Sequence, residues 1–235
     1  MARLRIFAGP NGSGKSTLIR RLEGQFSFGH YLNADDLFKE LSASHVLDLE
    51  RFGLKTSQKG WSKFWQTHGL SAHAPGLAES HIERNILVFR QSPKSYETAI
   101  LADFLRYALL KSEQSFSFET VFSHPAKITF IEKAVSRGYK FYLYFTTVSS
   151  PEISVERVRQ RVQQGGHGVP EDKIRTRYGR AMDQLLPAVR LAHRAYFFDN
   201  SQEMELVAEV SPEQNLWIHT KRVPLWFNDY VLARL

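Results

Sequence analysis

A run of small residues near the start of the chain has the composition of a loop that binds phosphate. Gly9, Gly14, Lys15 and Ser16 satisfy the pattern G-x-x-x-x-G-K-[ST] in every required position. Glycines let backbone N–H groups turn inward on an anion, the lysine reaches the β- and γ-phosphates, and the serine hydroxyl suits Mg²⁺. The pattern predicts a site for ATP, with GTP as the alternative nucleotide. The predicted nucleotide-binding residues are Gly9, Pro10, Asn11, Gly12, Ser13, Gly14, Lys15, Ser16 and Thr17.

Two carboxylates follow the stretch His30–Asn33, which has the pattern of a short strand. Asp35 and Asp36 then stand at the tip of that strand, where parallel strands next to a phosphate loop face the ligand crevice. One of them is expected to cap the following helix. The other is expected to accept a proton from an attacking hydroxyl or to hold Mg²⁺, and Asp35 is the preferred candidate for that role.

A third candidate, Glu119, lies in the segment FSFETVFSHP. A charge inside an apolar strand is costly unless a partner or a metal ion is near. We therefore expect Glu119 to coordinate Mg²⁺ through water or to receive a substrate hydroxyl, with Thr120 hydrogen bonding nearby. The alternative is a glutamate that points to solvent from an edge strand.

Arginines gather on two predicted helices that flank Gly165-Gly166. Arg161 lies on the first helix, and Arg177 and Arg180 share one face of the second. Residues 157–183 are therefore expected to form a lid that closes over a phosphate and brings an arginine onto it. A solvated basic face is the alternative interpretation.

The elements that must position these residues follow from the hydrophobic pattern. Five apolar or alternating segments separated by helical stretches predict an α/β domain with a mostly parallel five-stranded sheet flanked by helices. These segments are Leu4–Ala8, His30–Asn33, Phe116–Phe122, Lys140–Val148 and Ala195–Phe198. We expect one domain over residues 1–235, with a helical cap inserted at about 42–94 and an extension of strands and a short helix at about 202–235.

The predicted cap is rich in aromatic residues and histidines. Trp61, Phe64 and Trp65 have helical spacing, which favours a small local core over a base-stacking platform. The spacings of the histidines match no metal-ligand pattern, so surface or capping roles are expected for them. They are His68, His73 and His81.

The last predicted strand ends in YFFDNS. It lacks the aspartate–glutamate ending of a motor ATPase, because Asn200 follows Asp199. Asn200 is instead expected to touch the nucleotide base.

The composition limits the classes of protein to which the chain can belong. The 235-residue chain has no cysteine, which excludes disulfides and thiolate metal sites. Because no apolar stretch approaches the about 18 residues that span a membrane, we expect a cytoplasmic protein without a membrane partner. The net charge of +7 permits a nucleic-acid partner, but no block of more than two Lys/Arg residues occurs.

Taken together, these segments resemble the zeta-toxin-like family of P-loop kinases. The resemblance rests on GPNGSGKST, NADD, FETVFS, ERVRQRVQQGGHGVPEDKIRTRYGR and FFDNS. It covers most of residues 1–201, but covers the segment 42–94 poorly. The segment around Gly165-Gly166 is more specific than the phosphate loop, which many proteins share.

The resemblance implies a phosphotransferase in which Lys15 binds phosphate, Ser16 binds Mg²⁺, Asp35 is the general base and Glu119 helps to hold the substrate. The toxins of this family phosphorylate the 3′-hydroxyl of UDP-N-acetylglucosamine and are neutralised by a small helical antitoxin. Their pattern E-G-T-x-R is replaced here by ETVFS, and His167 stands where their lid places an arginine.

The sequence therefore predicts an ATP- and Mg²⁺-dependent kinase that phosphorylates a hydroxyl of a small molecule, such as a nucleotide sugar, and that has an antitoxin-like protein partner. Two alternatives stay open. One is a kinase acting on nucleic-acid ends, and the other is a nucleotide-gated binding module without transfer activity.

Overall fold

The computed structural model describes residues 1–166 and 168–234. His167, which was compared with a lid arginine, lies outside the described residues. The chain folds as two compact units. The first consists of Met1–Phe28 and Ser117–Leu235, and the second of Gly29–Phe116.

The first unit is built on a sheet with a parallel centre. Its neighbouring strands, in order, are β10 (Leu216–Ile218), β9 (Glu205–Val210), β8 (Arg194–Asp199), β7 (Lys140–Thr147), β1 (Arg3–Ala8) and β6 (Phe116–Thr120). β7 is parallel to both β1 and β8, whereas β9 is antiparallel to β8 and β10 is antiparallel to β9. The α/β class is confirmed, but the sheet exceeds the predicted five strands because the C-terminal segment continues it.

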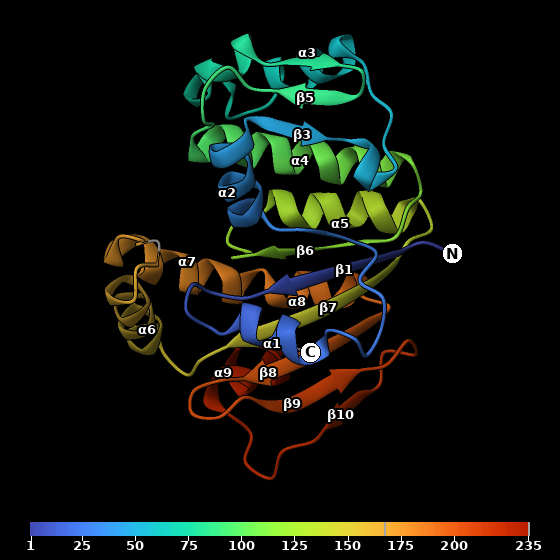
Figure 1. Cartoon of the computed structure of the whole chain (residues 1–235). Helices are drawn as coiled ribbons and strands as arrows, with labels where there is room; N and C mark the ends of the chain where they lie inside the picture. Colours follow the sequence, from blue (N-terminus) through green and yellow to red (C-terminus); the bar gives the residue numbers. More distant parts are fainter. Residues whose placement is uncertain (167, 235) are drawn as a thin grey trace. The chain divides into compact units, whose positions relative to one another are not determined.

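Helices pack on both faces of this sheet. They are α1 (Lys15–Leu22), α5 (Ala126–Ser136), α6 (Pro151–Gln163), α7 (Glu171–Asp183), α8 (Leu185–Leu191) and α9 (Leu225–Tyr230), followed by the 3₁₀ turn η4 (Leu232–Arg234). Figure 1 shows α1 and α8 on opposite sides of the strands. Phe145 and Phe197 contact Trp226 and Phe227 of α9, so the C-terminal helix completes the core of one face.

The second unit contains the segment expected to be a helical cap. Its elements are β2 (His30–Leu32), α2 (Ala34–Ser44), β3 (Val46–Asp48), η1 (Glu50–Phe52), α3 (Gln58–Gln66), η2 (Ser71–His73), η3 (Pro75–Glu79), β4 (His81–Glu83), β5 (Ile86–Val88) and α4 (Ser95–Lys111). β5 pairs antiparallel with both β3 and β4. Arg84 and Asn85, with φ of 47° and 66°, make the tight turn between β4 and β5. Segment 42–94 is therefore mixed in structure rather than purely helical.

The predicted local core of this unit is present. Trp61 is fully buried, and its Nε1 donates to Ser80 Oγ at 2.8 Å. Trp61 and Phe64 both meet the Phe104 ring edge-on, at centroid distances of 5.1 and 5.4 Å. The aromatic residues thus pack α3 on α4.

Two of the three histidines singled out from the sequence, His68 and His73, have structural partners. His68 Nε2 lies 3.3 Å from Asp103 Oδ2, and His73 stacks on Tyr96. Across residues 1–166 and 168–234, no group of three His, Cys, Asp or Glu side chains is placed to hold a metal ion. Within the same ranges, none of the helices has the length and apolar character needed to cross a membrane.

Candidate active site

The loop between β1 and α1 needs its glycines for two reasons. Gly9, Gly12 and Gly14 have φ of 147°, 73° and 96°, which side chains disfavour. The second reason is that the backbone of Thr146 and the side-chain amide of Asn200 approach the loop closely. A Cβ on Gly9 would lie 1.9 Å from the Thr146 carbonyl oxygen, and one on Gly14 would lie 2.1 Å from Asn200 Nδ2. The sequence pattern thus corresponds to a tightly packed strand–loop–helix turn.

The start of α1 is open to an anion. Gly14 is its N-cap and provides no side-chain acceptor, and no acidic residue occupies the first turn. The first N–H groups of a helix lack partners within the helix and carry a partial positive charge. A phosphate group can accept hydrogen bonds from these N–H groups, and its negative charge is attracted by their partial positive charge.

Lys15 lies inside the loop. Its Nζ donates to the carbonyl oxygens of Gly9 and Pro10, both at 2.9 Å, and lies 3.9 Å from Glu119 Oε1. The Lys15 side chain is only 8% exposed. Carbonyl dipoles and one carboxylate therefore balance the nearly buried charge of Lys15. A bound phosphate could replace these groups as the partner of the ammonium group.

Ser16 and Glu119 form the second half of the site. Ser16 Oγ donates to Glu119 Oε2 at 3.2 Å, although 103 residues separate the two. Glu119 lies near the end of β6, the neighbour of β1 in the sheet, and its side chain is 18% exposed. The alternative of a solvent-facing glutamate is therefore wrong. The first unit brings Lys15, Ser16 and Glu119 together at the phosphate loop.

Thr120 has a local partner. Its Oγ1 accepts from the Phe122 N–H at 3.1 Å, in a turn where Phe122 has a φ of 63°. Its contact with a substrate stays a prediction.

Asn200 lies against the phosphate loop. Its Nδ2 donates to the Ser13 carbonyl oxygen at 2.9 Å. The adjacent Asp199 accepts from Ser201 N at 2.7 Å and from Trp226 Nε1 at 2.6 Å. Asp199 thus anchors the C-terminal helix, and Asn200 supports the loop. A contact of Asn200 with a nucleotide base stays a prediction.

Asp35 belongs to the second unit, in the first turn of α2. The expectation that Asp35 or Asp36 caps this helix is wrong, because the cap is Asn33, whose Oδ1 accepts from Asp35 N at 2.8 Å. Both aspartates are exposed. The role of Asp35 as the base stays a prediction.

The predicted lid, residues 157–183, covers the second half of α6 and the whole of α7, and these two helices lie side by side in Figure 1. Arg161 and Arg180 are exposed in the last turns of their helices, and Arg177 is half-buried. The sequence interpretation did not select Arg157, whose Nη2 donates to the Ser201 carbonyl oxygen at 3.3 Å. A Cβ on Gly12 would lie 2.8 Å from the Ser154 carbonyl oxygen and 3.4 Å from Arg157 Cβ, so Ser154 and Arg157 of α6 both lie beside the phosphate loop.

The sequence interpretation also did not identify the ion pairs that Arg175 forms with Glu152 and Glu171, of which the pair with Glu152, between α6 and α7, is here called the clamp. Arg175 of α7 donates from Nη1 to Glu152 Oε1 of α6 at 2.5 Å, and from Nε to Glu171 Oε1 at 2.9 Å. Hydrogen bonds from Arg175, which has the largest effect, from Ser150 and from the Glu152 backbone N–H together lower the pKa of Glu152 to about 2. The i,i+4 spacing of Glu171 and Arg175 could have indicated one of these pairs, but not the pair between helices.

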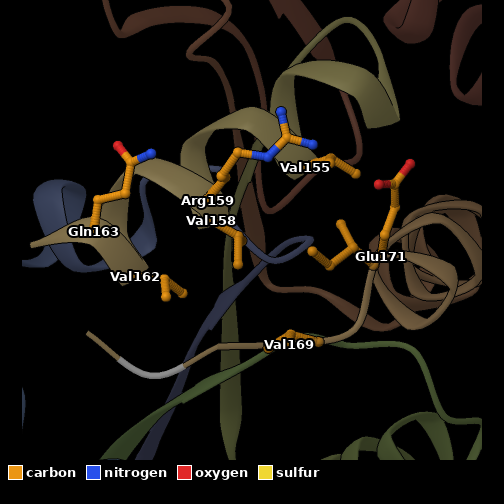
Figure 2. A pocket seen from close by; sticks show the side chains of 8 residues that line it. Val155, Val158, Arg159, Val162, Gln163, Val169 and Glu171 are labelled. Carbon is orange, nitrogen blue, oxygen red and sulfur yellow. The ribbon is translucent and has the colours of Figure 1, made fainter. Parts of the chain in front are cut away.

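The apolar sides of the two helices enclose a groove of about 260 Å³. Figure 2 shows its lining side chains, which come from both helices and the connection before α7. They are Val155, Val158, Arg159, Val162, Gln163, Val169, Glu171 and Ile174. Five of these are aliphatic, and none belongs to the phosphate loop. The groove therefore lies outside the phosphate loop.

No family model and no curated protein matches this sequence. Solved structures do match the fold. The AvrRxo1-ORF1:AvrRxo1-ORF2 structure with sulphate ions has a TM-score of 0.55 at 15% identity, covering 94% of this chain and 62% of the matched chain. The AvrRxo1-ORF1:-ORF2 structure with ATP also has a TM-score of 0.55, at 16% identity, covering 93% and 61%.

A structure of the PezAT chromosomal toxin–antitoxin system of Streptococcus pneumoniae has a TM-score of 0.50 at 12% identity, covering 99% of this chain and 78% of that one. The chain thus spans about three fifths of the matched AvrRxo1 chain. These similarities confirm, for the fold, the resemblance to the zeta-toxin-like P-loop kinases.

Proposed function

We propose that this protein is an ATP- and Mg²⁺-dependent phosphotransferase that phosphorylates a hydroxyl of a small molecule. The observation that carries the proposal is the cluster of Lys15, Ser16 and Glu119 at the open start of α1. A phosphate loop with a buried lysine suits the β- and γ-phosphates, and a carboxylate beside the loop hydroxyl suits the metal side of the nucleotide. The AvrRxo1 structure with ATP supports the choice of nucleotide.

Lys15 would exchange its hydrogen bonds to the Gly9 and Pro10 carbonyls for bonds to phosphate oxygens. These bonds are charge-assisted at both ends, so they favour the bound state. The N–H groups at the start of α1 would hold the phosphates in place without reorganisation.

The oxygen atoms of Ser16 and Glu119 fit Mg²⁺, which prefers hard oxygen ligands and keeps several waters. Ser16 would bind the ion directly and Glu119 through water. When bound, the ion would neutralise charge on the phosphates. The two protein ligands are 3.2 Å apart at their nearest oxygens, so little movement is needed to face one ion.

The acceptor hydroxyl would lose its proton to Asp35 as its oxygen bonds to the γ-phosphorus, while the bond from that phosphorus to the β–γ bridging oxygen breaks and ADP leaves. Arg161, Arg177 or Arg180 would meet the developing charge on the transferred group as the lid closes. Exclusion of water by the lid would favour transfer to the acceptor over hydrolysis.

UDP-N-acetylglucosamine is the first acceptor to test, with Glu119 and Thr120 as its candidate contacts. Because ETVFS replaces the E-G-T-x-R pattern of the toxins, other compounds with a hydroxyl group should be tested as well. An antitoxin-like protein is the proposed partner, since similar folds occur in the AvrRxo1-ORF1:ORF2 and PezAT systems.

The test is transfer of labelled γ-phosphate from Mg·ATP into a cell metabolite extract, followed by mass identification of the product. UDP-N-acetylglucosamine is assayed separately, and the Lys15→Ala variant provides the blank. A labelled small molecule that depends on Lys15 supports the proposal. Tight ATP binding without a labelled product, or label found only on nucleic-acid ends, overturns it in favour of the corresponding alternative.

A further inference from the structure

One face of the sheet in the first unit carries a row of aromatic rings. The strand register places Phe7, Tyr144, Tyr196 and Trp217 in line across β1, β7, β8 and β10, with Glu209 of β9 between the last two. Side chains in register on neighbouring strands share a face of the sheet. The row therefore runs from the covered centre of the sheet to its edge.

The outer part of this row is accessible. Trp217 is 58% exposed, and Tyr196 is half-buried. Tyr144 stacks on Tyr196 at a centroid distance of 5.0 Å and an interplanar angle of 15°. Tyr142, half-buried in the preceding row, meets His193 edge-on. Tyr142, Tyr196 and Trp217 thus present aromatic surface from three different strands.

Cations accompany the aromatic rings. Register places Arg3 beside Lys140, and Arg5 in line with Tyr142 and Arg194 on the same face. Arg5 lies over the Tyr142 ring, with its Cζ 5.4 Å from the centroid. Arg5 is only 6% exposed, so the accessible cations of this face are Arg3, Lys140 and Arg194.

Two carboxylates also belong to this part of the sheet: Glu209 lies within the row, between Tyr196 and Trp217, and Glu213 lies in the turn after β9. Glu209 Oε1 is 3.7 Å from His219 Nε2. Glu213 accepts from Ser211 Oγ at 2.7 Å, and this hydrogen bond, with a contribution from Arg194, lowers its pKa. The net charge of this face is still positive, and the whole chain has a net charge of +7.

From this combination we infer that the aromatic face, defined by Tyr142, Tyr196, Trp217, Lys140 and Arg194, binds single-stranded nucleic acid. Every base has a π-face that stacks on an aromatic ring, and arginine or lysine side chains pair with the phosphates between bases. The Glu209 carboxylate can accept from an exposed base amino group. A second copy of the chain is a poorer occupant, because a symmetric contact would bring the same cations together.

This inference does not depend on the proposed kinase activity. The aromatic face uses the middle and edge of the sheet, whereas the phosphate loop follows the carboxyl end of β1 and faces Glu119 near the end of β6. Variants of Tyr196 or Trp217 are expected to keep the parental affinity for ATP, which separates the two proposals experimentally.

The test is fluorescence anisotropy of the full chain with a labelled single-stranded RNA of about 20 nucleotides, a single-stranded DNA and a DNA duplex, each of mixed sequence. Stacking contributes about 1–3 kcal/mol per base, so Tyr196→Ala and Trp217→Ala are each expected to weaken single-strand binding about fivefold or more. Trp217→Phe, which keeps a ring, should retain most of the affinity. Tyr96→Ala removes a 47% exposed tyrosine from the other unit and is the matched control.

The charge contribution is tested by the salt dependence. Arg194→Ala is expected to lower the slope of log affinity against log salt by about 0.7, as for one lost phosphate contact with a single strand. Arg90→Ala, a change at a 76% exposed arginine of the other unit, should leave the slope unchanged. Circular dichroism verifies that each variant is folded.

Three results would overturn the inference. They are absence of single-strand binding by the parent chain, equal effects of Trp217→Ala and Tyr96→Ala, and tighter binding of the duplex than of the single strands. Concentration-dependent self-association that Trp217→Ala abolishes would assign the face to a second copy instead.

Discussion

The side-chain amide of Asn200 donates a hydrogen bond to the carbonyl oxygen of Ser13 at 2.9 Å and so ties the end of β8 to the phosphate loop. The backbone N–H of Asn200 donates to Thr147 O at 2.8 Å, which fixes the residue to the neighbouring strand β7. The same amide lies where a side chain on Gly14 would have to be. The sheet therefore holds the shape of the loop from outside.

Asn200→Asp is expected to weaken Mg·ATP binding about tenfold. The change removes the donor to Ser13 and places a carboxylate against a carbonyl oxygen and near the bound phosphates. Isothermal titration calorimetry measures the effect. Asn215→Asp makes the same charge change at an exposed turn and is the control. Equal affinities in the two variants would show that Asn200 does not support the loop.

Lys15→Ala is expected to weaken Mg·ATP binding tenfold or more, because a buried charge-assisted contact to phosphate is lost. Calorimetry of this variant beside Lys59→Ala, a change at an exposed lysine, separates the local loss from a change in net charge. Unchanged affinity in Lys15→Ala would contradict the assignment of the nucleotide site.

Asp35→Asn is expected to lower phosphate transfer by about 10² or more while ATP still binds, because the amide keeps the shape but cannot accept the proton. Asp36→Asn is the matched variant, since the two aspartates are adjacent in the first turn of α2. Rates are measured with labelled ATP and the identified acceptor. Parental rates in Asp35→Asn would move the role of base to Asp36 or Glu119.

The sequence predicted the parts of the site that have local signals or follow from strand order. The phosphate loop is a contiguous pattern, and Glu119 was found because a charge interrupts an apolar strand. The Arg175–Glu152 clamp was missed because nothing in the local pattern of α7 indicates which residue of α6 it faces. β3, β4 and β5 have three residues each, which is too short for an alternating pattern to show. The β-like runs after residue 201 were recognised, but their pairing with β8 depends on non-local contacts.

Arg175→Ala is expected to increase hydrogen exchange in α6 and α7, because the clamp joins the first turn of α6 to α7. Hydrogen exchange detected by mass spectrometry measures the change. Arg159→Ala, which removes an ion pair confined to α6, is the control. Equal exchange in the two variants would show that the clamp does not hold the helices together.

The clamp also predicts a pH dependence. The pKa of Glu152 is lowered from 4.5 to about 2, so its contribution is fully present above the ordinary value and is lost as pH falls through about 2. Protection of α6 and α7 in the parent should therefore not change with pH through the ionisation of Glu152 at pH 5 and above. In Glu152→Gln the acid-dependent loss assigned to this carboxylate should disappear, and its persistence would assign that loss to another group.

The lid arginines distinguish a kinase from a passive nucleotide-binding module. Negative charge spreads over the transferred group during phosphoryl transfer, so a cation that reaches it stabilises the transition state more than bound ATP. Arg177→Ala or Arg180→Ala is therefore expected to lower the transfer rate much more than the affinity for ATP, with Arg161→Ala as the variant on the other helix. A contact made only at the transition state contributes about 3–4 kcal/mol, which is a few hundredfold in rate.

The control for these variants is Arg190→Ala, which removes an exposed arginine from α8, outside the lid. A solvated basic face predicts that the three lid variants resemble this control within about twofold, because exposed charges contribute little. Turnover and ATP affinity are measured for all four variants. A rate loss without an affinity loss in at least one lid variant assigns that arginine to the transition state. Near-parental rates in all three would refute a catalytic lid.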